Sequence, residues 1–168
     1  VEAFRNAPSI ESHQSGMDDW LLGRLSESRT RWVEAMNNVS LREGVMISHF
    51  EMLSDWQWYR RRGGSNKTTI QRYMSNWAEM LAPATPHLAE EFWDSLGRDG
   101  LLASKTLSDL SDLSSKDWSH TLAMEEYLRE LIDSARNIKI LAQKHSEKPL
   151  TKMVIQTSPL WKSELASD

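Results

Sequence analysis

The chain has 168 residues, a formal net charge of −4 and no cysteine, so we expect one ordinary domain without disulfides or thiolate metal sites. Its apolar residues never form the run of about 18 that a membrane span needs, and no secretory signal pattern opens the chain. These features favour a cytoplasmic protein without a membrane partner. Because the chain begins at Val1 and not at a methionine, we expect a fragment of a longer protein.

A first helix is expected to start at Asp18 or Asp19, whose carboxylates suit an N-cap, and to reach about Asn38. Residues 1–17 before it are expected to be a flexible lead-in. Its apolar side chains recur with the 3.6-residue period of a helix that packs on one face. They are Leu21, Leu22, Leu25, Trp32, Val33 and Met36.

A second helix is predicted by the capping-box pattern of Ser40 and Glu43, and it should end at Arg62. Gly63 and Gly64 then supply the left-handed residue with which helices often end, and the arginines of the last turn suit the negative end of the helix dipole. The inward face is predicted to contain Leu41, Val45, His49, Met52, Trp56 and Tyr59.

Two prolines predict a sharp corner between a third and a fourth helix. The third helix is expected to start at Ser65 or Asn66, and it must end just before Pro83, which disfavours helix in the residue that precedes it. Thr85 then offers a cap, and Pro86 takes the first helical position, where its missing N–H matters least. The predicted inward residues are Ile70, Tyr73, Met74, Trp77 and Leu81, followed by Leu88, Phe92 and Leu96.

The rest of the chain is expected to form a loop over residues 97–115, a long helix over residues 119–144 and a strand after Pro149. The predicted fold class is therefore all-α, with a bundle of about five helices in residues 18–148. The short strand is expected to begin a further domain in residues 149–168.

No motif of a catalytic or metal site is present. The five histidines lack metal-ligand spacing, no phosphate-binding glycine loop occurs, and adjacent glutamates diverge around their helices. We therefore predict no catalytic residue, no metal and no cofactor in this chain.

The charges are unevenly distributed along the chain. All charged side chains between Trp56 and Ala78 are basic, whereas acids outnumber bases between Glu79 and Asp133. Such a distribution can attract a polyanion to one zone of a protein whose net charge is negative. Solvated helix faces are the alternative explanation.

Aromatic residues adjoin this basic zone in the stretch DWQWYRRRGGSNK. Arginine side chains suit phosphate groups, and an aromatic ring can stack on an unpaired base. Trp56 and Tyr59 have the spacing of core residues, whereas Trp58 points elsewhere and is the candidate for stacking on a base.

Three segments resemble the anticodon-binding helical domain of class I aminoacyl-tRNA synthetases, in particular the leucyl-tRNA synthetases of archaea and the eukaryotic cytosol. DDWLLGRL is similar to the family pattern D-x-W-L-L-S-R-L, and DWQWYRRR is similar to N-D-L-R-W-Y-x-R-R. MLAPATPHLAEEFW resembles the most specific pattern, L-L-A-P-x-x-P-H-x-A-E-E-x-W. EEYLRELID and KMVIQTSPLWK extend the resemblance, and the latter favours leucine. Gly23 in place of serine, and Trp56-Gln57 in place of Leu-Arg, depart from the family.

The resemblance implies a tRNA-binding part of a ligase that joins leucine to tRNA(Leu) with ATP and magnesium. The chain lacks the His-x-Gly-His element and the Lys-Met-Ser-Lys-Ser loop of such enzymes, so the fragment itself is expected to be non-catalytic and to work with the rest of the parent chain. Since leucine enzymes make little use of the anticodon bases, mainly phosphate contacts are expected. The candidate RNA-binding residues are Arg60, Arg61, Arg62, Lys67, Arg72, Trp58, Arg136 and Lys139.

Two alternatives are a helical adaptor that binds a protein through a tryptophan-rich face, and the corresponding domain of an isoleucyl-, valyl- or methionyl-tRNA synthetase. The eight tryptophans motivate the adaptor hypothesis, because aromatic residues are enriched at protein interfaces.

Overall fold

The computed structural model describes residues 16–144 together with Lys152 and Val154. The regular elements in this part of the chain are all helical, which confirms the predicted all-α class. They are α2 (Gly16–Asn37), α3 (Leu41–Val45), a π-helical turn (Met46–Glu51), α4 (Met52–Arg61), α5 (Lys67–Leu81), α6 (Pro86–Ser95), a 3-10 turn (Leu102–Ser104), α7 (Ser111–Ser114) and α8 (Ser119–Lys144). The predicted lead-in lies outside the described residues except for Gly16 and Met17, which already belong to α2. Of the predicted strand, only Lys152 and Val154 are described, so the strand stays a prediction.

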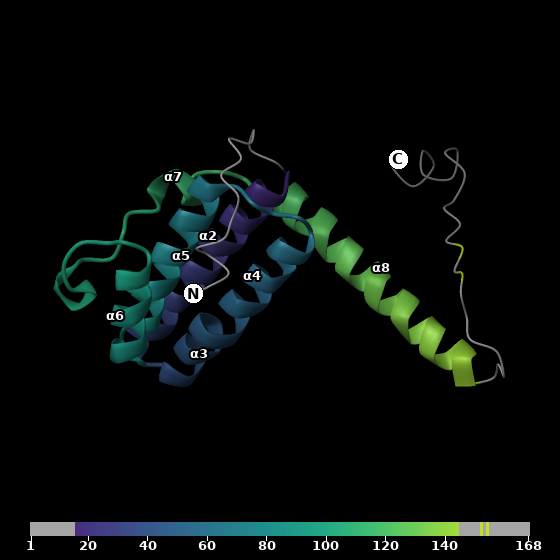
Figure 1. The fold of residues 1–168 in the computed structure, drawn as a ribbon, viewed down its shortest axis with the longest axis horizontal. Coiled ribbons are helices and arrows are strands. Elements are labelled where there is room, and N and C mark those ends of the chain that lie inside the picture. The colour runs from purple at the N-terminus through teal and green to yellow at the C-terminus, as the bar shows by residue number, and fades with distance from the viewer. Residues whose placement is uncertain (1–15, 145–151, 153, 155–168) are drawn as a thin grey trace. The chain divides into compact units, whose positions relative to one another are not determined.

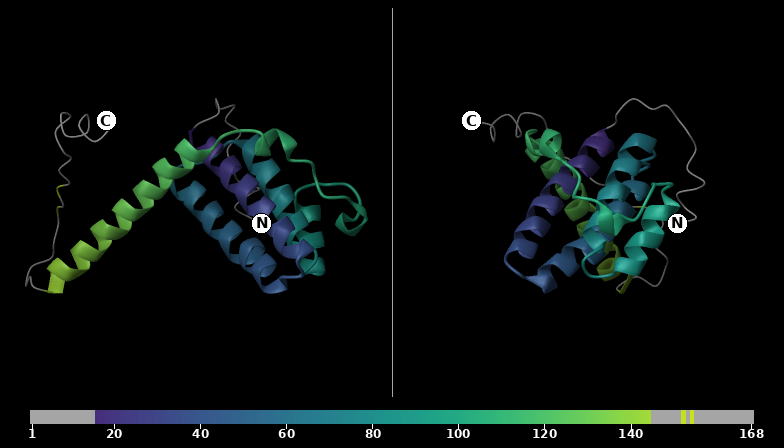
Figure 2. Two further views of the ribbon diagram at one scale, coloured as in Figure 1. Left: turned by 180° about the vertical axis from the view of Figure 1, so that it is seen from behind. Right: turned by 90° about the vertical axis from the view of Figure 1, so that its left-hand side faces the viewer.

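The chain divides into two compact units between Glu125 and Glu126, inside α8. In the first unit, α2 is the central helix and packs against α3, α4 and α5, while α6 packs against α5 (Figure 1 and Figure 2). The apolar faces of α2, α4 and α5 meet in a main core, and α5, α6 and the 3-10 turn form a second, smaller one around Ala89 and Trp93. The most deeply buried members of the main core include Leu21, Leu25, Ile47, Met52, Tyr59, Ile70, Tyr73 and Met80.

A π-helical turn interrupts the second predicted helix, which otherwise runs over the expected range. A π turn accommodates one more residue than an α turn, so it rotates the faces that precede and follow it relative to each other. Ile47 and Ser48 are consequently buried, whereas Leu41, predicted to face inward, is 60% exposed. Met52 and Tyr59 lie in the core as predicted.

Ser40 and Thr85 stand at the predicted N-cap positions of α3 and α6, but the side-chain cap hydrogen bonds do not form. Ser40 makes no side-chain cap hydrogen bond to α3, and its backbone N–H completes the end of α2 by donating to Ala35 O at 2.8 Å. Val39, with φ of 56°, provides the left-handed residue of that turn. Thr85 does not cap α6 either, and its hydroxyl lies 3.3 Å from both Leu81 O and His49 Nε2.

The proline corner forms as predicted, since α5 ends at Leu81 and Pro86 is the first residue of α6. The predicted buried face of α6 is partly wrong, because Leu88 is 52% exposed while Ala89 and Trp93 are buried. The small side chain of Ala89 allows the backbone of α6 to approach α5, which centres the contact one residue later than predicted.

A cluster of hydrogen-bonded polar residues, Asp18, Tyr59 and Asn66, joins α2, α4 and α5. Asp18, which was expected to cap α2, instead accepts a hydrogen bond of 2.6 Å from the Tyr59 hydroxyl, and α2 already includes Gly16. The same hydroxyl accepts from the backbone N–H of Asn66, whose side chain caps α5, so this helix begins where it was expected to begin. Burial, and then the hydrogen bond to Asp18, raise the pKa of Tyr59, so the phenol stays protonated and keeps donating. These hydrogen bonds fix the end of α4 against the start of α5.

Candidate nucleic-acid interface

The end of α4 places three successive arginines around one helix terminus. Gly63, with φ of 89°, adopts the predicted left-handed conformation. The N–H of Gly64 donates to Tyr59 O at 2.9 Å, and the N–H of Gly63 donates to Arg60 O at 3.1 Å, which is the Schellman pattern. Gly64 is also required sterically, because a Cβ there would lie 2.3 Å from ring carbons of Tyr59. We call this segment, Arg60–Lys67, the arginine turn.

Arg60 and Arg61 are exposed and each is supported by an aromatic ring. The Arg60 guanidinium lies 5.7 Å from the Trp56 ring centroid and donates to Gly64 O at 3.0 Å. The Arg61 guanidinium lies 5.5 Å from the Trp58 ring centroid. Such cation–π contacts restrict the guanidinium groups while they stay in contact with water. Both groups are therefore pre-positioned for an anion.

Trp58 is half-buried and packs against the core, with its indole N–H donating to Glu125 Oε2 at 3.0 Å. Its ring supports Arg61, a role that the spacing did not suggest. Stacking of Trp58 on a base stays a prediction.

Carboxylates engage two of the candidate arginines of the first unit. Arg62 forms an ion pair with Glu125 at 3.2 Å, and Arg72 donates from both terminal nitrogens to Asp112. The hydrogen bonds from Arg72 hold the pKa of Asp112 below its ordinary value. Lys67, the first residue of α5, is exposed.

Arg136 and Lys139 belong to the second unit and are exposed on α8. Arg136 donates to Asp133 at 3.1 Å, one helical turn earlier. Within the first unit, four exposed candidates belong to the arginine turn, namely Arg60, Arg61, Arg62 and Lys67.

The partners of these arginines were not found by sequence reasoning. Glu125 is 63 residues from Arg62, and Asp112 is 40 residues from Arg72. Both carboxylates come from the acidic zone, but no local spacing connects them with the basic zone.

The described tryptophans do not form the exposed face that an adaptor would need. Trp20, Trp32 and Trp93 are buried, and the other tryptophans of residues 16–144 are half-buried. These tryptophans pack in or against the core, and some of them support arginines.

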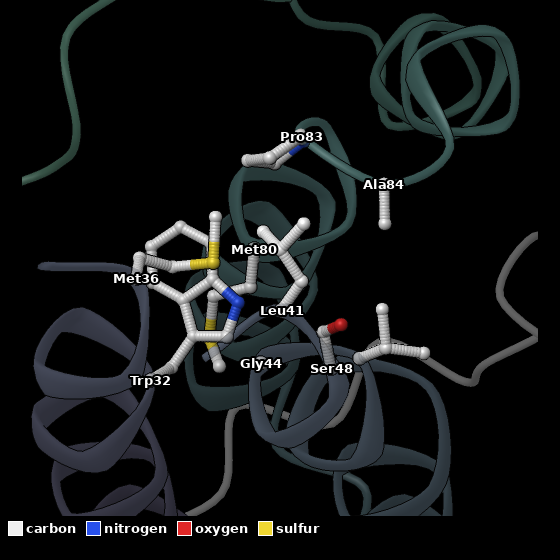
Figure 3. A pocket seen from close by; sticks show the side chains of 9 residues that line it. Trp32, Met36, Leu41, Gly44, Ser48, Met80, Pro83 and Ala84 are labelled. Carbon is white, nitrogen blue, oxygen red and sulfur yellow. The ribbon is translucent and has the colours of Figure 1, made fainter. Parts of the chain in front are cut away.

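An apolar pocket of about 130 Å³ lies at the proline corner (Figure 3). Trp32, Met36 and Met80 form one side of the pocket, and Pro83 and Ala84 of the proline corner also line it. Binding sites for substrates usually add several convergent polar groups to an apolar lining, and this pocket is almost wholly apolar. It can accommodate only a small apolar group.

Neither a membrane-spanning helix nor a metal-binding cluster is found among the described residues. None of their helices is both long enough and apolar enough to cross a bilayer. Nor do their histidines, aspartates and glutamates include a group of three or more that could bind a metal ion.

Comparison with known proteins identifies the family to which the chain belongs. Residues 18–154 match the family described as the anticodon-binding domain of tRNA ligase. Proteins named leucine–tRNA ligase are similar along most of the chain. That of Methanococcus maripaludis is 31% identical over 94% of this chain and 16% of its own length, and that of Methanothrix thermoacetophila is 32% identical over 89% and 15%. That of Archaeoglobus fulgidus is 32% identical over 73% and 13%. The chain thus spans about a sixth of the length of these relatives, and it belongs to the family of anticodon-binding domains of tRNA ligases.

Proposed function

We propose that this domain binds tRNA(Leu) through the arginine turn, mainly by contacts to backbone phosphates. One observation carries the proposal: Arg60 and Arg61 are exposed, each is backed by an aromatic ring, and they lie on the same turn as the exposed Lys67. Guanidinium groups bind phosphate oxygens through charge-assisted hydrogen bonds, and such contacts position a nucleic acid without reading its sequence.

The geometry ranks the candidate residues. Arg60, Arg61 and Lys67 come first, because none of them forms an ion pair within 4.0 Å among the described residues. Arg62 and Arg72 follow, since each already neutralises a carboxylate. The remaining candidates are Trp58, Arg136 and Lys139.

The parent protein is proposed to be a cytoplasmic leucine–tRNA ligase, in which this domain holds the tRNA while another region attaches leucine. The support is the name shared by the relatives and the small share of their length that the chain covers. ATP and magnesium would be used by that other region. Among the described residues, no group of three or more histidines, aspartates or glutamates could hold the magnesium ion.

A salt titration tests the proposal. The affinity of this chain for a tRNA(Leu) transcript is measured by filter binding at several salt concentrations. The logarithm of the affinity should fall linearly with the logarithm of the salt concentration, with a slope of roughly −0.7 to −0.9 for each phosphate neutralised. We expect a slope near −2 to −3 for Arg60, Arg61 and Lys67 together. A tRNA for another amino acid should bind within a few-fold, because phosphates carry no sequence. A flat salt response would refute the proposal.

A further inference from the structure

The carboxylate of Glu125 accepts several hydrogen bonds beside the arginine turn. Glu125 is buried, with 8% of the residue exposed, and its carboxylate accepts three N–H groups from the end of α4. Trp58 Nε1 and Arg62 Nε donate to Oε2 at 3.0 and 3.2 Å, and Arg62 Nη2 donates to Oε1 at 3.2 Å. The Arg62 contact is therefore bidentate, the arrangement in which an arginine binds a carboxylate most specifically.

This contact makes Arg62 different from the two arginines that precede it. Arg60 and Arg61 rest on aromatic rings, which leave their positive charge uncompensated. Arg62 has its Nε–Nη2 edge, one of the edges through which an arginine binds a phosphate, already occupied by Glu125, which also compensates its charge. A phosphate that took this edge would leave a buried carboxylate without its counter-charge, which is strongly unfavourable.

We propose that Glu125 withholds Arg62 from RNA, so that the arginine turn presents two of its three guanidinium groups to the phosphates. This inference rests on the proposed function. Glu125 is a positioning residue in this account: it also fixes Trp58, the ring that supports Arg61.

The test is the salt slope of the Glu125→Gln variant with a tRNA(Leu) transcript. Glutamine keeps an oxygen that can accept the Trp58 N–H, but it lacks the charge that holds Arg62. The released Arg62 should add one phosphate contact, which steepens the slope by roughly 0.7 to 0.9 and tightens binding about 5- to 8-fold at 0.1 M salt. The Arg62→Gln/Glu125→Gln double variant should return to the wild-type slope.

Glu126→Gln is the matched control, because it removes the same charge from the next residue, which is exposed. Its slope should equal that of the wild type, and an equal gain in Glu126→Gln and Glu125→Gln would overturn the inference. Arg62→Gln alone should also keep the wild-type slope. A loss of slope in that variant would show that Arg62 already contacts RNA, and this result does not depend on the Glu125 variant folding. A wild-type chain without salt dependence would instead refute the proposed function, and this inference with it.

Discussion

Replacing Glu79 by alanine is expected to destabilise the first unit by about 3–5 kcal/mol, because it leaves a buried arginine without its counter-charge. Glu79 is 4% exposed and Arg29 is 6% exposed, and Arg29 Nη2 donates to Glu79 Oε2 at 3.0 Å. The same carboxylate accepts the backbone N–H and the hydroxyl of Ser108, so it also fixes the loop that follows α6. Urea unfolding followed by circular dichroism measures the change.

Two variants control this experiment. Glu91→Ala removes an exposed glutamate from α6 and should change the free energy of unfolding by no more than about 0.5 kcal/mol. The double variant Arg29→Met/Glu79→Met replaces both charges by apolar chains, and we expect it to be clearly more stable than Glu79→Ala. A loss below about 1 kcal/mol for Glu79→Ala would mean that the buried pair is not important for the stability of the fold.

Replacing both exposed arginines of the turn, as Arg60→Gln/Arg61→Gln, should weaken tRNA binding roughly 25- to 60-fold at 0.1 M salt. Each lost phosphate contact removes about 0.7 to 0.9 from the slope of log affinity against log salt. The loss of two contacts therefore reduces the slope by about 1.4 to 1.8. At 0.1 M salt, this change in slope lowers the decimal logarithm of the affinity by about 1.4 to 1.8. Filter binding over a range of salt concentrations measures both quantities.

The control for that experiment is Arg31→Gln/Arg42→Gln. Both residues are exposed, on α2 and α3, and the variant has the same change in net charge. It should reduce the affinity only slightly, through the long-range field. If it weakened binding as much as Arg60→Gln/Arg61→Gln, the net charge, and not the arginine turn, would determine the affinity.

Local signals in the sequence were sufficient for the arginine turn and for α5. The turn needs a residue with positive φ directly after α4, and Gly63 meets that need without help from distant residues. Asn66 caps α5 through its own side chain, and the apolar period of α5 identified Ile70 and Tyr73 as core residues. Each of these features depends on residues within a few positions of one another.

Features that depend on packing could not be predicted in this way. The π turn that rotates Leu41 outward has no marker in the sequence, and Val39 is an unusual residue for a left-handed turn. The difference among the three arginines also depends on tertiary contacts. The sequence presents Arg60, Arg61 and Arg62 as equivalent, and only the approach of Glu125 from the start of α8 distinguishes the third from the other two.

The most direct test of RNA binding at the arginine turn uses its own glycines. In a spectrum of the chain labelled with ¹⁵N-glycine, addition of a tRNA(Leu) transcript should shift or broaden the amide signals of Gly63 and Gly64. The signals of Gly97 and Gly100, which follow α6, should stay in place. If Gly97 and Gly100 responded while Gly63 and Gly64 did not, the RNA would bind elsewhere on the domain and the account would be wrong.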